Sequence, residues 1–275
     1  MTESSDAIKA SVQVISAPIP ASEELVKLLD DCGAVLRRLF SCLCLRLPFR
    51  QDDDSFISVW ALGYIVILCD VCSSLKTLLT SGEHNRSILI LRRVAFEYFV
   101  RFRFYCDDRS QAKVALDHAT PEWKRFAARL WDEEVAIIED PRFDEALHKS
   151  ADSTHKEFWR IMNQVFSPED AKRFYARFYM HPSWLAHGAS AGMIDVLGVD
   201  DGRGVVHFTS KRKTDEIGFN AFVFLATFAD DVAVTMKASE EAETKALLRA
   251  KNKFAADRGI EIIEAQKARK NDGSK

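Results

Sequence analysis

The sequence predicts a mainly α-helical protein, an all-α multi-helix bundle with one small β excursion. Eleven glycines and seven prolines in 275 residues are few, whereas all-β sandwiches and barrels need many such residues for their turns. Apolar side chains instead recur at helical spacing over long stretches of the chain. A hydrophobic fraction of 47% beside 29% charged residues is typical of a globular chain with a sizeable core.

Three long helices are expected in the first half of the chain. The first begins at Ser22, which two glutamates follow, and it ends before Pro48, because serine before acidic residues caps a helix and proline stops one. The second is expected over 55–80 and is apolar on all sides in its first half, as in a central helix. A turn at 81–84 leads to the third helix over 86–106, so these two helices form an antiparallel hairpin.

The second half alternates helices with one irregular region. The residue before proline avoids the α conformation, so a helix that passes through His181 and Pro182 is expected to bend there. Five glycines from 188 to 204 mark the one place suited to β structure, a small hairpin or glycine-rich excursion near 193–209. Helical patterns cover 120–138, 154–165, 167–188 and 214–237.

One folded domain is expected, because no linker rich in proline, glycine and serine separates the two halves. Residues 1–20 have little apolar periodicity and are predicted to be a disordered tail. The helical-bundle domain then covers 21–238. Residues 239–275 mix charges of both signs, which is typical of a solvated helix that frays into a tail.

Charge and targeting signals favour a cytoplasmic protein without a membrane partner. Lys and Arg number 38 against 41 Asp and Glu, a net charge of −3, so no global field attracts nucleic acid or an anionic membrane. The N-terminus lacks the basic start and apolar block of a signal peptide. The apolar run over 56–69 stops at Asp70, short of the about 20 residues that span a bilayer.

The cysteines suggest reduced thiols and no metal. All six lie in the first 106 residues, within apolar helical stretches, as buried thiols of cytosolic proteins do. Cys69 and Cys72 form a C-x-x-C pair and Cys42 and Cys44 stand nearby in sequence, but zinc prefers such pairs on turns. The chain also lacks a glycine-rich phosphate loop and a dinucleotide fingerprint. We therefore expect neither a metal nor a cofactor.

The segment 86–105 places five arginines and one glutamate in an otherwise apolar helix. Arg86, Arg93, Glu97 and Arg101 are separated by seven, four and four residues, so they fall near one face and Arg93 can pair with Glu97. Desolvated charges cost several kcal/mol unless they are paired. One explanation is an anion site, because a guanidinium fork suits phosphate or carboxylate.

The other explanation for these charges is structural. Arg93 and Glu97 would then form a pair that holds the helical hairpin in register. Arg92, Arg101 and Arg103 would extend along the surface and place their charged ends in water.

A second group of polar residues lies at 179–188. Tyr179, Ser183 and His187 would stack on one face of a continuous helix, although Pro182 weakens the placement of Tyr179. A Ser/His nucleophile pair is disfavoured, because neighbours on one helix rarely present the geometry that such catalysis needs. We expect His187 to serve as a general acid or base, or to bond the Arg93/Glu97 pair across the bundle. The simpler alternative is a core histidine that caps its own helix.

Two short motifs carry a resemblance to a known family. The pattern S-x5-R-x3-E begins at Ser87 and the pattern Y-x3-S-x3-H-G begins at Tyr179. Together with the apolar helix before them, they resemble a family of mostly helical bacterial proteins known as a domain of unknown function, over about residues 50–235. The resemblance implies an all-helical bundle in which the arginine, the glutamate and the histidine meet, and it implies no established activity.

The chain also resembles, more faintly, the helical HEPN-type ribonucleases of bacterial defence and toxin systems. The signature of that family is an arginine, four to six residues and then a histidine. Here three residues separate Arg177 from His181, and seven separate Arg173 from it. This departure from the signature counts against ribonuclease activity.

Three functions are compatible with these patterns. In the first, an interior cluster binds an anionic ligand such as a phosphate-bearing small molecule or an RNA end. The second is metal-independent RNA cleavage, with His187 as acid or base and an arginine that stabilises the developing phosphorane charge. The third is a non-catalytic interaction module that forms homo-oligomers through apolar helix faces or recruits a partner through 193–209. The candidate catalytic residues are His187 and Glu97, and the candidate ligand-binding residues are Arg93, Arg86, Arg101, Ser183 and Tyr179.

Overall fold

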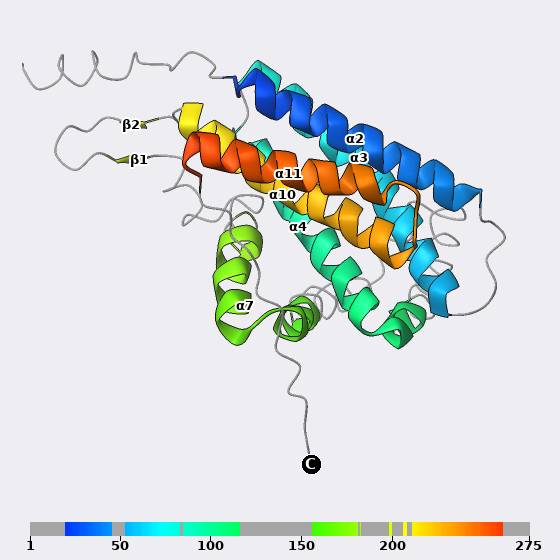
Figure 1. Ribbon diagram of the computed structural model, residues 1–275. Helices are drawn as coiled ribbons and strands as arrows, with labels where there is room; N and C mark the ends of the chain where they lie inside the picture. The colour runs from blue at the N-terminus through cyan, green and yellow to red at the C-terminus, as the bar shows by residue number, and fades with distance from the viewer. Residues whose placement is uncertain are drawn as a thin grey trace, which may run out of the picture.

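The predicted all-α class is confirmed by a computed structural model, in which a helical bundle forms the body of the protein (Figure 1). The predicted helix over 120–138, the N-terminal tail before residue 20 and the C-terminal tail after residue 260 lie outside the described residues. The structure describes residues 20–45, 53–82, 85–115, 156–180, 182, 198–199, 206–207 and 211–260.

The long helices of the bundle begin and end close to where the sequence patterns predict. Ser22 directly precedes the first of them, and Gly259 follows the last in a left-handed conformation with φ of 59°, which is the usual glycine C-cap. Within the described part of the chain the long helices are α2 (Glu23–Cys44), α3 (Asp53–Ser81), α4 (Asn85–Asp107), α10 (Lys211–Thr235) and α11 (Glu241–Arg258).

A shorter helical unit packs beside α4 (Figure 1). It begins with the helical residues 156–165 and continues into α7 (Pro168–Phe174). The side chain of Ser167 accepts a hydrogen bond from the Asp170 amide at 3.2 Å, and proline follows at the first helical position, so this start has the cap that its sequence predicts. Directly after α7 the chain forms a π-helix, η1 (Tyr175–Met180).

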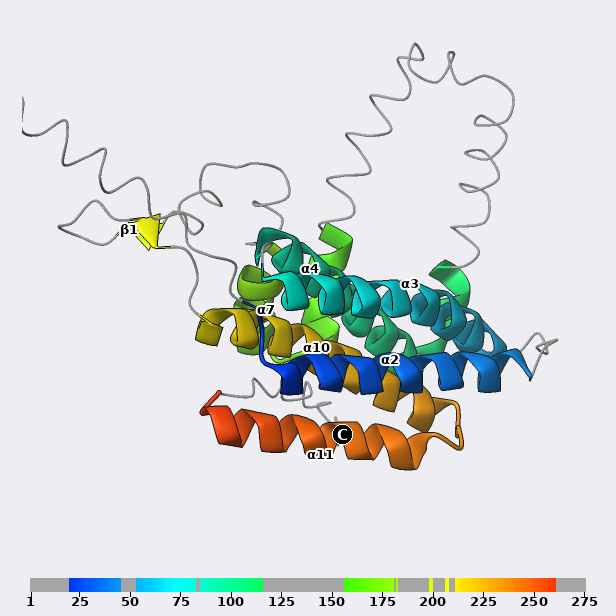
Figure 2. The same ribbon diagram turned by 90° about the horizontal axis from the view of Figure 1, so that it is seen from above.

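The α4 and α10 helices run parallel, which places their amino termini at the same end of the bundle (Figure 2). Phe96 packs on Phe224, and ten residues later Cys106 lies 3.4 Å from Thr235. The α2 helix starts at this end too, because the Ser22 amide donates to Asp215 at 2.8 Å near the start of α10. We call this end, where α2, α4 and α10 begin, the amino end of the bundle.

The C-terminal charged helix has a buried face. Phe254 of α11 is fully buried and stacks on Phe219 of α10 with 5.0 Å between ring centroids. Most of the other α11 side chains are polar and exposed or half-buried. The mixed charges therefore describe the outer face of α11, while its inner face belongs to the same core as α10.

A small antiparallel pair of strands lies within the glycine-rich segment, as predicted. The strands are β1 (Gly198–Val199) and β2 (Val206–His207), and Gly198 pairs with His207. The described part of this segment is limited to these residues.

Among the residues that the structure describes, two helices are long and apolar enough to cross a membrane by length and composition alone. They cover Phe56–Ser81, with a mean hydropathy of 2.0, and Thr214–Thr235, with 1.5. Helices at the core of soluble proteins have the same properties, and 72% of the most apolar window of the second is buried inside the bundle. The cytoplasmic location and the absence of a membrane partner therefore stay predictions.

All six cysteines are free thiols, as the sequence predicts, and Cys106 is one of those whose acidity is changed by the fold. Burial raises the pKa of Cys106 to about 12, although a hydrogen bond with Thr235 opposes this. At about pH 8 only about one Cys106 thiol in ten thousand is then a thiolate, the form that reacts with iodoacetamide. We expect mass spectrometry to find Cys106 unmodified in the folded protein and alkylated after denaturation. Rapid alkylation of folded protein would contradict this.

Candidate functional site

The structure brings several of the predicted site residues to one region of α4 and η1. Arg93, Glu97 and Arg101 lie on successive turns of α4, and Tyr179 lies on η1 beside them. Arg86 belongs to the first turn of α4. Ser183 and His187 lie outside the described residues.

Glu97 pairs with Arg101 rather than with Arg93. The Nε and Nη2 atoms of Arg101 both lie 3.2 Å from Oε1 of Glu97. A glutamate four residues before an arginine has the favourable orientation for a pair within one helix. Burial lowers the pKa of Arg101. Glu97 raises it, as do Glu157 and two tyrosines to a smaller extent, and together these groups outweigh burial, so the pKa lies above its usual value. The charge of Arg101 is therefore matched within the protein.

Arg93 lies instead on an aromatic stack. Its guanidinium carbon is 4.4 Å from the centroid of the Tyr179 ring, a cation–π distance. Tyr179 is 1% exposed and lies between Phe158, at 4.4 Å, and Tyr175, at 5.1 Å, with both pairs of rings stacked. Among the described residues, the buried Nε of Arg93 has no hydrogen-bond partner.

Arg92 is the most deeply buried charge of the site. It is 4% exposed, its guanidinium lies 5.1 Å above the Phe178 ring, and Nη2 donates to the carbonyl oxygen of Arg177 at 3.2 Å. Its Nε has no hydrogen-bond partner, and no carboxylate forms an ion pair with it, within the part of the chain that the structure describes. Burial, helped by the charge of Arg177, lowers the pKa of Arg92 to about 10, and Glu216 opposes this only in part.

The expectation that Arg92 extends to solvent was wrong. The residue stands four positions after Ile88 and four before Phe96, both fully buried. Residues at this spacing share one helix face, so the position of Arg92 lies on the core stripe of α4. The apolar periodicity of the helix therefore already indicated that Arg92 is buried.

The π-helix explains why two consecutive arginines each lie on a ring. A π-helical turn holds more residues than an α-turn and is often found at functional sites. In η1 it presents Phe178 to Arg92 and Tyr179 to Arg93, and it directs the Arg177 carbonyl oxygen to Arg92.

The surroundings of these arginines are positive. We call Arg92, Arg93 and Arg177 the arginine cluster. Within the described residues its one bonded carboxylate is that of Glu216, which is 2.9 Å from Arg177. The region therefore holds more positive than negative charge.

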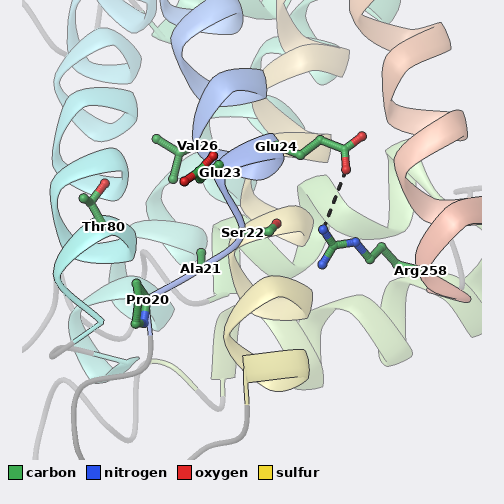
Figure 3. A pocket seen from close by; sticks show the side chains of 8 residues that line it. All are labelled: Pro20, Ala21, Ser22, Glu23, Glu24, Val26, Thr80 and Arg258. Carbon is green, nitrogen blue, oxygen red and sulfur yellow. Dashed lines mark ion pairs between the residues drawn. The ribbon is translucent and has the colours of Figure 1, made fainter.

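A cavity of about 720 Å³ lies elsewhere at the amino end, at the start of α2 (Figure 3). Arg258 points into it, with Nη1 2.6 Å from Asp215 and Nη2 3.7 Å from Glu24. These acidic partners already match the one arginine of the cavity, so it suits an anion less well than the arginine cluster does. Its lining residues are Pro20, Ala21, Ser22, Glu23, Glu24, Val26, Thr80 and Arg258.

Comparisons with known proteins do not assign the chain to a family. No protein-family model matches the sequence, and no curated protein and no solved structure is significantly similar to it. The two resemblances described from the sequence, to a helical family of unknown function and to the HEPN-type ribonucleases, therefore stay predictions. Among the residues that the structure describes, no group of three or more histidine, cysteine and acidic side chains could hold a metal ion.

Proposed function

We propose that this protein binds a phosphate-bearing anion at the arginine cluster. The observation that supports this most directly is Arg92, a buried guanidinium that forms no ion pair with a carboxylate among the described residues. A charge in the protein interior is costly unless it is paired. A bound anion would supply the missing pair.

Phosphate fits the chemistry of this cluster better than a single carboxylate does. Each guanidinium presents donors in a fork that matches two phosphate oxygens. The guanidinium groups of Arg92 and Arg177 share the Phe178 ring, at 5.1 and 5.6 Å from its centroid, and that of Arg93 lies over the next ring of η1, Tyr179. A phosphate carries more charge than a carboxylate and has more acceptor oxygens.

The other predicted site residues have supporting roles in this proposal. Tyr179 holds the guanidinium of Arg93 in place by stacking. Glu97 pairs with Arg101 and so leaves Arg93 for the ligand. Ser183 and His187 follow η1 closely in the sequence, and their contribution to the site is proposed from the sequence alone. We place this function in the cytoplasm, where free thiols such as the six of this chain persist.

Arg93→Gln is expected to weaken binding of inorganic pyrophosphate by about 10-fold to 100-fold, since a hydrogen bond to a charged group contributes about 1.5 to 3 kcal/mol. Titration calorimetry at constant ionic strength measures the dissociation constant. The matched control is Arg38→Gln, because Arg38 is also an arginine within a long helix, but it pairs with Glu243 and lies on α2 away from the cluster. Equal affinities for wild type and Arg93→Gln, or no binding to wild type, would contradict the proposed function.

A further inference from the structure

The geometry points to a nucleoside phosphate as the ligand, with its base stacked on Trp159 beside Tyr175 and its phosphate on the arginine cluster. This inference rests on the proposed function and specifies the class of ligand. It starts from the aromatic side chains that lead from the buried core to the surface beside Arg93.

The aromatic stack beside Arg93 ends in two partly exposed rings. Phe158 and Tyr179 are buried, with 0% and 1% exposure, and they stack on each other. Tyr175 stacks on Tyr179 at 5.1 Å and is partly exposed. Trp159, also partly exposed, meets Tyr175 edge to face at 5.0 Å. The stack thus continues from the core to the protein surface.

The outer rings differ from the inner ones in what they contribute to folding. Phe158 and Tyr179 fill the core between the helices, and their burial accounts for their presence. The partly exposed faces of Tyr175 and Trp159 bury less area, so core packing accounts for them less completely. These two rings lie beside Arg93, because Tyr175 stacks at 5.1 Å on Tyr179, the ring that the Arg93 guanidinium covers at 4.4 Å.

Aromatic rings beside arginines form a recognisable site for nucleotides. Bases stack on tyrosine and tryptophan regardless of their identity, because every base has a π face, and arginines bind the phosphate. Inorganic phosphate would leave the two rings unused, since it has no apolar face. A ligand with a base and a phosphate uses both parts of the surface at once.

The test compares AMP with ribose 5-phosphate, which differ only in the base. In the full-length wild-type protein we expect AMP to bind about 5-fold to about 100-fold more tightly, the range that stacking of one base provides. Trp159→Leu, which keeps an apolar side chain, is expected to reduce AMP affinity towards that of ribose 5-phosphate and to leave ribose 5-phosphate unchanged. Phe40→Leu is the matched control, because Phe40 is a partly buried aromatic on α2. Tyr175→Leu provides a second variant if Trp159→Leu does not fold.

Each outcome separates this inference from the proposed function. Equal affinities of wild type for AMP and ribose 5-phosphate would overturn the nucleoside phosphate but leave anion binding at the arginines intact. Binding of pyrophosphate without binding of AMP would also overturn the nucleoside phosphate and leave the proposed anion binding intact. Failure of pyrophosphate, AMP and ribose 5-phosphate to bind would overturn both. A short RNA with a 5′-phosphate tests the source of the nucleotide: tighter binding than AMP identifies an RNA end, and weaker binding identifies a free nucleotide.

Discussion

Phe96→Ala is expected to reduce the free energy of unfolding by about 3 to 5 kcal/mol, the usual cost of removing a buried phenylalanine. Phe96 has no exposed surface and lies where α4 meets three other segments. Its ring contacts Phe224 of α10 at 5.0 Å, Phe178 of η1 at 5.4 Å and Phe158 at 6.2 Å between centroids. No single neighbour can move to fill the cavity without leaving another contact, so relaxation should recover little of the loss.

For a chain of this size the expected fall in thermal midpoint is about 6 to 15 °C. Calorimetry or circular dichroism measures it without ligand. Phe96→Leu serves as the control, since it keeps much of the apolar volume and should cost only about 1 to 2 kcal/mol. A midpoint for Phe96→Ala within about 2 °C of wild type would contradict the central position of this ring.

Phe96→Ala is also expected to affect the arginine cluster, because the core packs directly against it. Phe178 packs against Phe96 on one side and lies under the guanidinium of Arg92 on the other. Because interiors are close-packed, a cavity at Phe96 should loosen the support of Arg92. We therefore expect Phe96→Ala to weaken pyrophosphate binding below its melting temperature as well, whereas Phe96→Leu should bind nearly as wild type does.

The helices were predictable because their signals are local. The acidic residues after Ser22, the proline after Ser167 and the period of apolar side chains each act within a few residues. The π-helix was not predictable in this way. The sequence pattern indicated a bend at Pro182, but the change from α-helix begins earlier, at Tyr175, where the rings of η1 pack against α4. Tertiary packing, rather than a local residue preference, determines this geometry.

One contact of the candidate site was predicted from the sequence and another was not. Tyr179 and Arg93 were assigned to one cluster from separate motifs, and the structure places them in contact. The partner of Glu97 was predicted wrongly: Arg93 and Arg101 both stand four residues away, but a glutamate that precedes its arginine has the better orientation, and this favours Arg101. The ring of Tyr179, from a distant part of the sequence, attracts Arg93 and leaves Arg101 to Glu97.

Arg92→Met is expected to make the protein more stable and unable to bind pyrophosphate. Burial lowers the pKa of Arg92 to about 10, and this change corresponds to a cost of about 3 kcal/mol for holding the charged form in the folded state. Methionine has a similar length and no charge. The substitution removes the interactions of the guanidinium with Phe178 and with the Arg177 carbonyl oxygen, and each loss costs about 1 kcal/mol of stability.

The net expectation is a gain of about 1 kcal/mol, or a rise of about 2 to 4 °C in thermal midpoint. The sign of the pH dependence provides an independent check. A base whose pKa is lower in the folded state binds fewer protons there, so wild-type stability should increase as pH rises through about 10. The advantage of Arg92→Met should therefore be constant from about pH 6 to about pH 8 and shrink above about pH 10.

Arg103→Met is the matched contrast for this prediction. Arg103 is a partly buried arginine of α4 that, unlike Arg92, forms an ion pair, with Asp231 at 3.3 Å, and it lies over Phe99. Its removal breaks an ion pair in the protein interior, so Arg103→Met should lower the midpoint, because breaking such a pair is destabilising. If Arg92→Met also lowers the midpoint, Arg92 is a structural charge. If it raises the midpoint and abolishes pyrophosphate binding, Arg92 is retained at a cost in stability, as functional groups often are.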